Sequence, residues 1–478
     1  MFSVDFNNIL DSRLGAVHGL KLADFNALIT DNEIVCKQVA AERAQGQHAF
    51  LNLPYQDEAI IDRIEELALT RARKIDDFVV LGIGGSALGA ITLHNALHPP
   101  FYNILPVKAR GKWPRLQVLD NIDPEETSAL FKLVKPKKTI FNVISKSGET
   151  TETTASFLIA LKFIKNACGK RWPEHLIVTT DAEKGFLRRF ANKEGVTTFE
   201  TPAKVEGRFS VLSSVGLVPA AFTGIDIRKL LKGAELLDQS IKNTLPESNP
   251  AFIAALVNYL YDIKKNKNML VIMPYGWQLK GLADWFRQLY PESLGKRLDL
   301  NKNEVNVGPA VLSSLGTTDQ HSQIQLYNEG PNNKLIVFIE IANFKSKIAI
   351  PNVLPNEENN SFLAKHRLAE LMQIEKRATE YALTRNQRPN YTIRLDEVSP
   401  ETIGGMFYFF ELLTAYAGKL YKINPYNQPG VESGKRATFG MLGREGYTGE
   451  TVDVNNILTK DDKWIIKAIP TRNKITSE

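Results

Sequence analysis

The sequence predicts an α/β protein with two lobes, each a doubly wound, mostly parallel sheet flanked by helices. The first observation is that short runs rich in Val, Ile and Leu alternate with helical patterns, as in parallel strands joined by crossover helices. The second is that this alternation occurs twice, and the third is a length of 478 residues, more than one ordinary core needs. The runs are FVVLGI from Phe78, LQVLD from Leu116, TIFNVIS from Thr139, LIVTTD from Leu176, NMLVIMPYG from Asn268 and LIVFIEIA from Leu335.

These patterns divide the chain into four expected parts. Residues 1–60 are expected to form a helical segment that packs on the body. The two α/β domains are expected at 61–222 and 223–435, and a C-terminal extension at 436–478.

Two helices stand out in the second half. An apolar stripe at helical spacing in GWQLKGLADWFRQLY predicts the first helix; it consists of Leu279, Leu282, Ala283, Phe286, Leu289 and Tyr290. Pro291 is expected to kink or stop this helix, which would leave Glu292 immediately beyond it. A second helix, with a packing role, is expected from near Ser361 through LAELMQIEKRATEYAL to the turn at residues 386–389.

Composition and charge narrow the class of protein. Hydrophobic residues make up 43% and charged residues 23%, as in soluble globular proteins. The 59 basic and 53 acidic side chains give a net charge of +6, which suits a small anionic ligand better than nucleic acid; the cluster Lys135–Lys138 is interpreted as a solvated turn. No run approaches the roughly 18 apolar residues of a membrane span, and no leader pattern opens the chain. We therefore expect a cytoplasmic protein without nucleic-acid or membrane partners.

The cysteines and histidines give no sign of a metal site. Cys36 and Cys168 are the two cysteines, they lack metal-ligand spacing, and we expect both to be reduced core residues. We expect neither a metal nor an organic cofactor.

Two turns could cradle a phosphate. In VVLGIGGSALG, Gly82, Gly84, Gly85, Ser86 and Gly89 follow a strand-like run, and glycines let backbone N–H groups approach an anion. Gly82, Gly84 and Ala87 also satisfy the looser dinucleotide fingerprint, so this turn alone leaves a nicotinamide-dependent dehydrogenase open. In ISKSGETTET, the hydroxyls of Ser145, Ser147, Thr150 and Thr151 surround Gly148 before a helix whose inner face should include Leu158, Leu161, Ile164 and Cys168.

GIGGS, followed by SKSGETTET, resembles the sugar-phosphate-binding half of the phosphoglucose isomerase family, whose fold is a tandem pair of SIS-type α/β domains. Three further segments match in order. VEGRFSVLSSVG contains Arg208, PESLGK contains Glu292, and GTTDQHSQIQLYNEGP contains His321. The C-terminal signature YNQPGVESGK contains Gln428 and Lys435. Glu206 departs from the family pattern, where glycine or proline is expected, and it adds a charge near Arg208.

The resemblance implies an interconversion of glucose 6-phosphate and fructose 6-phosphate by ring opening and proton transfer through a cis-enediol. His321 and Lys435 would open the ring, Glu292 would move the proton between the two carbons, and Arg208 would stabilise the enediolate oxygens. Glu152 would give electrostatic support. The substrate and its phosphate would be held by Gly85, Ser86, Ser145, Lys146, Ser147, Thr150 and Gln428. Lys146 would act through its backbone, and family members are usually homodimers in which the histidine reaches the neighbouring subunit's site.

Other functions remain as alternatives at this point. A related SIS-type isomerase of mannose phosphate or an amino-sugar phosphate would share the phosphate turns, but the length and the SGK ending of the C-terminal signature disfavour it. A dehydrogenase would rest on the glycine turn alone. A non-catalytic sugar-phosphate sensor would not need Glu292, His321 and Lys435 together.

Overall fold

The computed structural model describes residues 1–242, 244–357, 361–466 and 468. The chain forms two compact units, a body of Met1–Tyr426 and a C-terminal unit of Asn427–Glu478. Among the described residues, no helix is long and apolar enough to cross a membrane.

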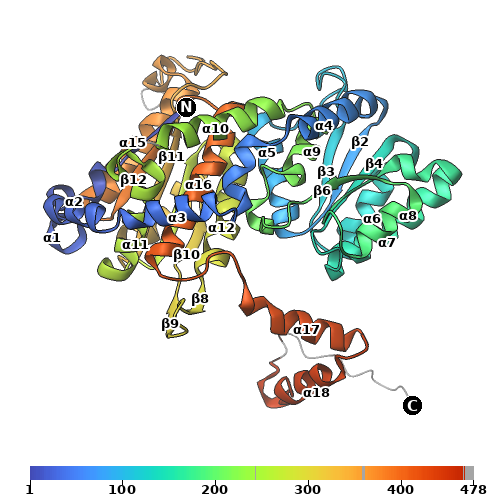
Figure 1. Cartoon of the computed structure of the whole chain (residues 1–478). Helices are drawn as coiled ribbons and strands as arrows, with labels where there is room; N and C mark the ends of the chain where they lie inside the picture. The colour runs from blue at the N-terminus through green and yellow to red at the C-terminus, as the bar shows by residue number, and fades with distance from the viewer. Residues whose placement is uncertain (243, 358–360, 467, 469–478) are drawn as a thin grey trace, which may run out of the picture. The chain divides into compact units, whose positions relative to one another are not determined.

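The first lobe of the body is a parallel five-stranded sheet with helices on both faces (Figure 1). Its strand order is β3-β2-β4-β5-β6. The strands are β2 (Asp77–Leu81), β3 (Arg115–Leu119), β4 (Thr139–Ile144), β5 (Leu176–Thr180) and β6 (Thr197–Glu200). Helices α4 (Glu58–Arg71), α5 (Leu88–Leu97) and α9 (Ser214–Phe222) cover one face, and α6 (Pro124–Leu133), α7 (Thr151–Cys168) and α8 (Phe186–Glu194) cover the other. The four strands expected here are confirmed, and β6 is an addition.

Strand order fixes where a ligand can enter this lobe. The chain makes β2 first, adds β3 on one side of it, and then crosses to add β4 on the other side. In open α/β sheets, ligands bind beyond the carboxyl ends of the strands where the winding reverses in this way. The glycine turn follows β2 and the Ser/Thr turn follows β4, so the two turns flank the reversal point.

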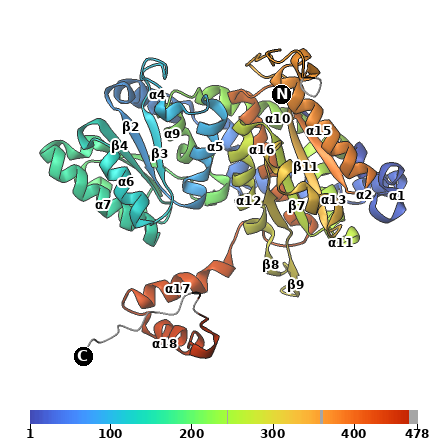
Figure 2. The same cartoon turned by 180° about the vertical axis from the view of Figure 1, so that it is seen from behind.

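The second lobe repeats this winding and adds one antiparallel strand. Its order is β1-β12-β11-β7-β10, with only β1 antiparallel to its neighbour. The strands are β1 (Phe2–Asp5), β7 (Met269–Tyr275), β10 (Ala310–Ser313), β11 (Lys334–Ile341) and β12 (Asn390–Leu395), beside a small ribbon of β8 (Lys296–Leu298) and β9 (Glu304–Val307). One face is covered by α10 (Ile227–Lys242), α11 (Pro250–Lys265), α12 (Lys280–Leu294) and α16 (Pro400–Leu420). The other is covered by α13 (Ile324–Glu329) and α15 (Leu368–Arg385), which Figure 2 shows in front of the sheet.

Helices α10 and α16 cross tightly in the core of the second lobe. A Cβ on Gly404 of α16 would lie 1.8 Å from the Leu230 carbonyl oxygen, and one on Gly233 of α10 would lie 1.8 Å from the Glu401 carbonyl oxygen. Only glycine therefore allows these two backbones to approach so closely. Helix α12 packs between α16 and α5 of the first lobe, so it bridges the two sheets.

The N-terminal segment begins with a strand, although the sequence predicts only helices there. β1 pairs with β12, and α1 (Asp11–His18), α2 (Leu22–Asp31) and α3 (Ile34–Ala44) follow. The alternating half-buried and exposed pattern of FSVD is too short to distinguish from a loop in the sequence. The helices pack on the second lobe, where Tyr261 donates a hydrogen bond to the Ile9 carbonyl.

Three expectations about helices need correction. Helix α12 runs through Pro291 to Leu294, so Glu292 lies inside its last turn and not beyond it. The helix persists because the buried Lys296 ammonium donates hydrogen bonds to the carbonyls of Glu292 and Ser293, which close its C-terminal end. The six residues of the expected α12 stripe are all fully buried, as expected.

Helix α15 begins at Leu368, later than the expected start near Ser361, because a 3-10 turn at Leu363–Lys365 precedes it. Its end before the turn at residue 386 is as expected. In α7, Leu158 is 52% exposed instead of buried. Ile164 is buried as expected, and Leu161 and Cys168 are partly buried against the core. Cys36 and Cys168 are free thiols but only partly buried.

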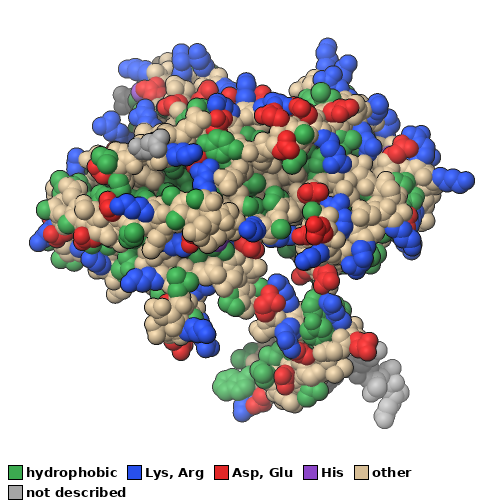
Figure 3. Space-filling model, in the orientation of Figure 1, with side chains coloured by type: hydrophobic (Ala, Val, Ile, Leu, Met, Phe, Trp, Pro, Cys, Tyr) green, Lys and Arg blue, Asp and Glu red, His purple; other side chains and the backbone are tan. Residues whose placement is uncertain are grey.

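The C-terminal unit contains two short helices, α17 (Glu432–Met441) and α18 (Thr448–Ile457), packed on each other. The rings of Phe439 and Tyr447 meet edge to face with centroids 5.3 Å apart. Basic and acidic side chains are interspersed over the face of the protein in Figure 3.

Glu411 gives a prediction about stability. It lies in the middle of α16, it is 0% exposed, and neither carboxylate oxygen has a hydrogen-bond partner among the described residues. Burial raises the pKa of Glu411 well above its usual value. The folded state keeps the Glu411 proton at pH values above about 4.3, where the unfolded state has lost it. The free energy of unfolding therefore falls as pH rises from about 4.3 toward the raised pKa of the folded state, by up to about 1.4 kcal/mol per pH unit.

Glu411→Gln is expected to remove this fall. Thermal unfolding midpoints of both proteins at pH 5 and pH 8 measure it, and the wild type should lose more stability than the variant between the two. Equal pH dependence in both proteins would contradict a neutral Glu411 in the folded state.

Candidate active site

The glycine turn is pressed against the loop that carries Arg208. Gly85 lies in the 3-10 turn η4 (Gly84–Ser86), and Arg208 lies in the 3-10 turn η8 (Gly207–Phe209). A Cβ on Gly85 would lie 2.2 Å from the Gly207 carbonyl oxygen, so a side chain at this position would push the two turns apart. The sequence motif therefore has a structural reason, and Ser86 sits half-buried at the same turn.

Arg208 is 3% exposed, and each of its three guanidinium nitrogens donates a hydrogen bond. Its Nε donates to Ser293 Oγ at 2.7 Å, one terminal nitrogen donates to the Pro425 carbonyl at 2.6 Å, and the other donates to Glu292 Oε1 at 3.4 Å. Burial lowers the pKa of Arg208, while the carboxylates of Glu292 and Glu206 act in the opposite direction. The three contacts fix the plane of the guanidinium beside the Glu292 carboxylate.

Glu292 is held from both sides in the last turn of α12. Its side chain is 30% exposed, so one edge of the carboxylate is reachable from solvent. Gln288, one helical turn earlier, donates its amide N–H to Glu292 Oε2 at 3.0 Å. The same amide nitrogen would lie 2.8 Å from a Cβ on Gly84, so Gln288 also fills the space beside the glycine turn.

Sequence reasoning missed Gln288, Ser293 and Lys296. The contact of Gln288 with Glu292 could have been inferred from the sequence, because residues four apart on a helix share a face and can hydrogen-bond. Burial and the nearby Arg208 charge together lower the pKa of Lys296 to about 8, while Glu292 opposes the shift. No pattern in the sequence marks Ser293 or Lys296, because their role depends on where α12 ends.

The Ser/Thr turn between β4 and α7 is braced by its own hydroxyls. Ser145 is buried and its hydroxyl lies 3.2 Å from Thr150 Oγ1 and 3.2 Å from the Gly148 amide nitrogen, which donates to it. Ser147 Oγ accepts from the Glu149 N–H at 3.1 Å. Thr150 occupies the N-cap position of α7, although its side chain makes no capping hydrogen bond. Glu152 follows in the first turn of the helix. The turn between β4 and α7 therefore combines several hydroxyl groups with a helix N-terminus, which favours anions.

Lys146 links the Ser/Thr turn to the Arg208 loop. Its ammonium donates a hydrogen bond to the Val205 carbonyl at 2.8 Å, three residues before Arg208. The side chain is engaged with protein backbone, and the expected contact of a ligand with the Lys146 backbone stays a prediction.

Three further expected residues lie on other elements of the chain. His321 ends the 3-10 turn η11 (Thr318–His321) after β10 and is exposed to solvent. Lys435 lies on α17 of the C-terminal unit, where its ammonium pairs with Glu432 at 2.9 Å, and Gln428 precedes a 3-10 turn of the same unit. Among the described residues, no group of three or more His, Cys, Asp or Glu side chains could hold a metal ion.

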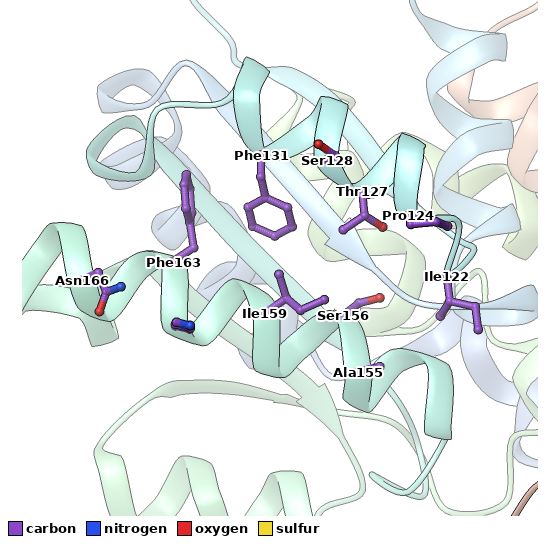
Figure 4. A pocket seen from close by; sticks show the side chains of 11 residues that line it. Ile122, Pro124, Thr127, Ser128, Phe131, Ala155, Ser156, Ile159, Phe163 and Asn166 are labelled. Atoms are coloured by element: carbon purple, nitrogen blue, oxygen red, sulfur yellow. The ribbon is translucent and has the colours of Figure 1, made fainter. Parts of the chain in front are cut away.

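A separate groove of about 610 Å³ lies between α6 and α7 (Figure 4). Phe131 and Phe163 extend into it from the two helices, Ile159 lies in the middle of the groove, and Ile122 lines its far end. Its lining is mainly apolar with one lysine, Lys162, which suits an anion poorly. The polar groups at the carboxyl edge of the first sheet are therefore the better candidate for phosphate chemistry.

Comparison with known proteins shows the family of the chain. The family model described as phosphoglucose isomerase matches residues 61–444. The glucose-6-phosphate isomerase of Carboxydothermus hydrogenoformans is 45% identical over 472 residues, which cover 97% of this chain and 99% of that protein. The one from Rubrobacter xylanophilus is 40% identical, over 93% of this chain and 98% of its own.

Solved structures agree with the fold. The crystal structure of a hypothetical protein from Thermus thermophilus has a TM-score of 0.81 at 33% identity and covers 93% of this chain and 100% of its own. A glucose-6-phosphate isomerase from Chlamydia trachomatis has a TM-score of 0.71 at 21% identity, covers 86% of this chain and 81% of its own, and shares the fold. From the extent of these matches, the chain belongs to the phosphoglucose isomerase family.

Proposed function

We propose that this protein interconverts glucose 6-phosphate and fructose 6-phosphate. The observation that carries the proposal is the Glu292 carboxylate, held between Gln288 and the buried Arg208 at the edge where the glycine and Ser/Thr turns meet. An aldose–ketose isomerase needs a positioned base beside a fixed positive charge, and this pair supplies both. The relatives named glucose-6-phosphate isomerase support the same substrate pair.

In the proposed reaction, the Ser/Thr turn binds the phosphate through Ser145, Ser147, Thr150 and the backbone of Lys146. Gly85 and Ser86 line the sugar site from the other turn. Glu292 removes the proton from C2 of the open-chain aldose, which gives a cis-enediol. The hydroxyl proton of O2 passes to O1 as Glu292 returns the carbon-bound proton to C1, and the ketose results. Negative charge then develops on the enediolate oxygens, and the Arg208 guanidinium stabilises it without having to reorient.

Ring opening must come first, because the sugar phosphates are mostly cyclic. We propose that Lys435 and His321 donate and accept the protons of this step, that Gln428 helps to hold the phosphate, and that Glu152 supports them electrostatically. An ammonium is a compact donor for the ring oxygen, and imidazole exchanges protons near neutral pH.

The test is the purified protein with fructose 6-phosphate, with formation of glucose 6-phosphate coupled to a dehydrogenase specific for it. Rapid turnover is expected. Mannose 6-phosphate and glucosamine 6-phosphate run beside it as competing substrates. Turnover of one of these in place of fructose 6-phosphate would overturn the proposal in favour of a related sugar-phosphate isomerase.

The exposure of His321 supports a role across a dimer interface. We propose that the working form is a homodimer in which His321 of the partner subunit completes each site. Mixing two inactive variants, His321→Ala and Glu292→Gln, tests this. If the histidine acts across the interface, each mixed dimer has one site with both native residues, and about a quarter of wild-type activity should return after dissociation and reassociation of equal amounts.

No recovery of activity from verified mixed dimers would show that His321 serves its own chain's site.

We also propose a cytoplasmic location, which the two free thiols support, since exported proteins usually pair their cysteines. Detection of the native protein in the exported fraction would contradict it.

A further inference from the structure

A second polar cavity lies at the opposite edge of the first sheet from the candidate active site. Its volume is about 560 Å³, within the range of pockets for small ligands. It is formed where α4 and α7 end and where β2, β4 and β5 begin. Three short 3-10 turns carry half of its lining residues, η3 (Ala72–Lys74), η6 (Pro136–Lys138) and η7 (Gly169–His175). The candidate active site uses the carboxyl ends of the same strands, so the two sites are separate.

The lining of this cavity carries an excess of positive charge. Arg71, Lys74, Lys137 and Arg171 contribute cations, and Glu174 is its one carboxylate. Arg171 is paired with Glu174 through two hydrogen bonds of 3.0 and 2.7 Å, which neutralises one cation.

The ends of the neighbouring helices do not account for the remaining charge. The C-terminal ends of α4 and α7 each contribute about half a negative charge, so roughly two positive charges among the lining residues remain in excess. Lys138, next to the cavity, donates to the Lys74 carbonyl at 3.3 Å and adds a further cation nearby.

The floor of the cavity is apolar. Ile140 is buried there, with Ile75 and Ala167 beside it. His175 is held against this floor, because its Nδ1 lies 2.8 Å from the Thr139 carbonyl oxygen and donates to it. A cationic rim around an apolar floor matches a ligand with both anionic groups and a ring or other apolar part.

We propose that this cavity is a second anion site that binds a small molecule carrying two or more phosphate groups. The proposal does not depend on the isomerase activity, since none of the lining residues belongs to the candidate active site. The excess charge requires at least a dianion, and the apolar floor favours a phosphorylated molecule with a ring over the inorganic anion alone.

Cys168 provides a direct reporter of occupancy, because it is part of the lining. Burial raises the pKa of its thiol, and the charges of Lys137 and Arg171 oppose the shift, so both cations act at the position of the sulfur. Cys36 lies elsewhere, and burial raises the pKa of its thiol to about 12, so it serves as an internal reference for alkylation.

The experiment measures alkylation of Cys168 by iodoacetamide, a neutral reagent, in the full-length protein by mass spectrometry. Inorganic pyrophosphate and ATP are the probes, with potassium chloride at matched ionic strength as the blank and saturating fructose 6-phosphate present to occupy the isomerase site. A probe at ten times its dissociation constant should slow Cys168 alkylation about tenfold. ATP is expected to protect at a lower concentration than pyrophosphate, because its base can contact the apolar floor.

Charge-reversal variants separate this site from general electrostatics. Lys137→Glu, and independently Lys74→Glu, should abolish the protection. Lys193→Glu, an equal charge change on an exposed residue of α8 outside the cavity, should leave it intact. All three lysines are exposed, so the variants should fold. Failure of both probes to protect Cys168, or equal protection in the Lys137→Glu and Lys193→Glu proteins, would overturn the proposal.

Discussion

Replacing Glu292 by glutamine is expected to lower kcat for isomerisation by about 10²- to 10⁴-fold, the usual contribution of a general base. Glutamine keeps the size of the side chain and one carbonyl oxygen. That oxygen can still accept from either the Gln288 amide or the Arg208 guanidinium, which now contact Oε2 and Oε1. It cannot take a proton from carbon. KM should therefore change little while kcat collapses.

Coupled kinetics at saturating fructose 6-phosphate measure this effect, and exchange of a C1 hydrogen of fructose 6-phosphate with solvent gives a second readout that should also disappear. Glu329→Gln on α13 is the matched control, since it makes the same change at an exposed glutamate. A Glu292→Gln protein with near-normal turnover and an unchanged melting temperature would show that another group moves the proton.

Replacing Arg208 by lysine is expected to lower kcat by about 10²- to 10³-fold, comparable to the loss of one preorganised donor at an oxyanion. Lysine preserves the charge but offers a single nitrogen where the guanidinium uses three, toward Ser293, Pro425 and Glu292. The ammonium cannot keep all three contacts and also face a substrate oxygen.

The Ser293→Ala variant tests the positioning of the Arg208 guanidinium without changing its charge. It removes only the contact to Arg208 Nε, so a smaller loss of kcat is expected than for Arg208→Lys. Melting temperatures of both variants are measured beside kcat and KM. If Arg208→Lys lowered the melting temperature but left kcat unchanged at a temperature where it is folded, Arg208 would have only a structural role.

Much of the fold could be predicted because its strands are buried on both faces. All six residues of β4 are buried, and such a strand appears in the sequence as an unbroken apolar run. β1 and β12 were missed for the opposite reason, since FSVD is short and NYTIRL contains polar residues that the sheet buries by hydrogen bonding. The end of α12 was misplaced because proline usually stops a helix, and the compensating Lys296 lies two residues beyond the last helical position.

The candidate site was predictable in its residue types but not in its geometry. The family motifs point to Arg208 and Glu292 as separate residues. That Arg208 Nη1 lies 3.4 Å from Glu292 Oε1 is seen in the folded structure and not in the sequence. The supporting contact from Ser293 follows from the rotation of α12, which the sequence does not specify. For His321, Lys435 and Gln428 the proposed roles depend on a second subunit or on the C-terminal unit, so they stay predictions.

The second lobe is assembled from both ends of the body, because β1 joins β12 at its edge while the first lobe is inserted between them. On the ribosome, the first lobe can fold once residue 222 has emerged. The opening strand has no partner until Asn390–Leu395 has been made. During that interval its apolar neighbours in α2 and α3 are without the core that later covers them, which makes this stretch of the nascent chain a natural target for chaperones.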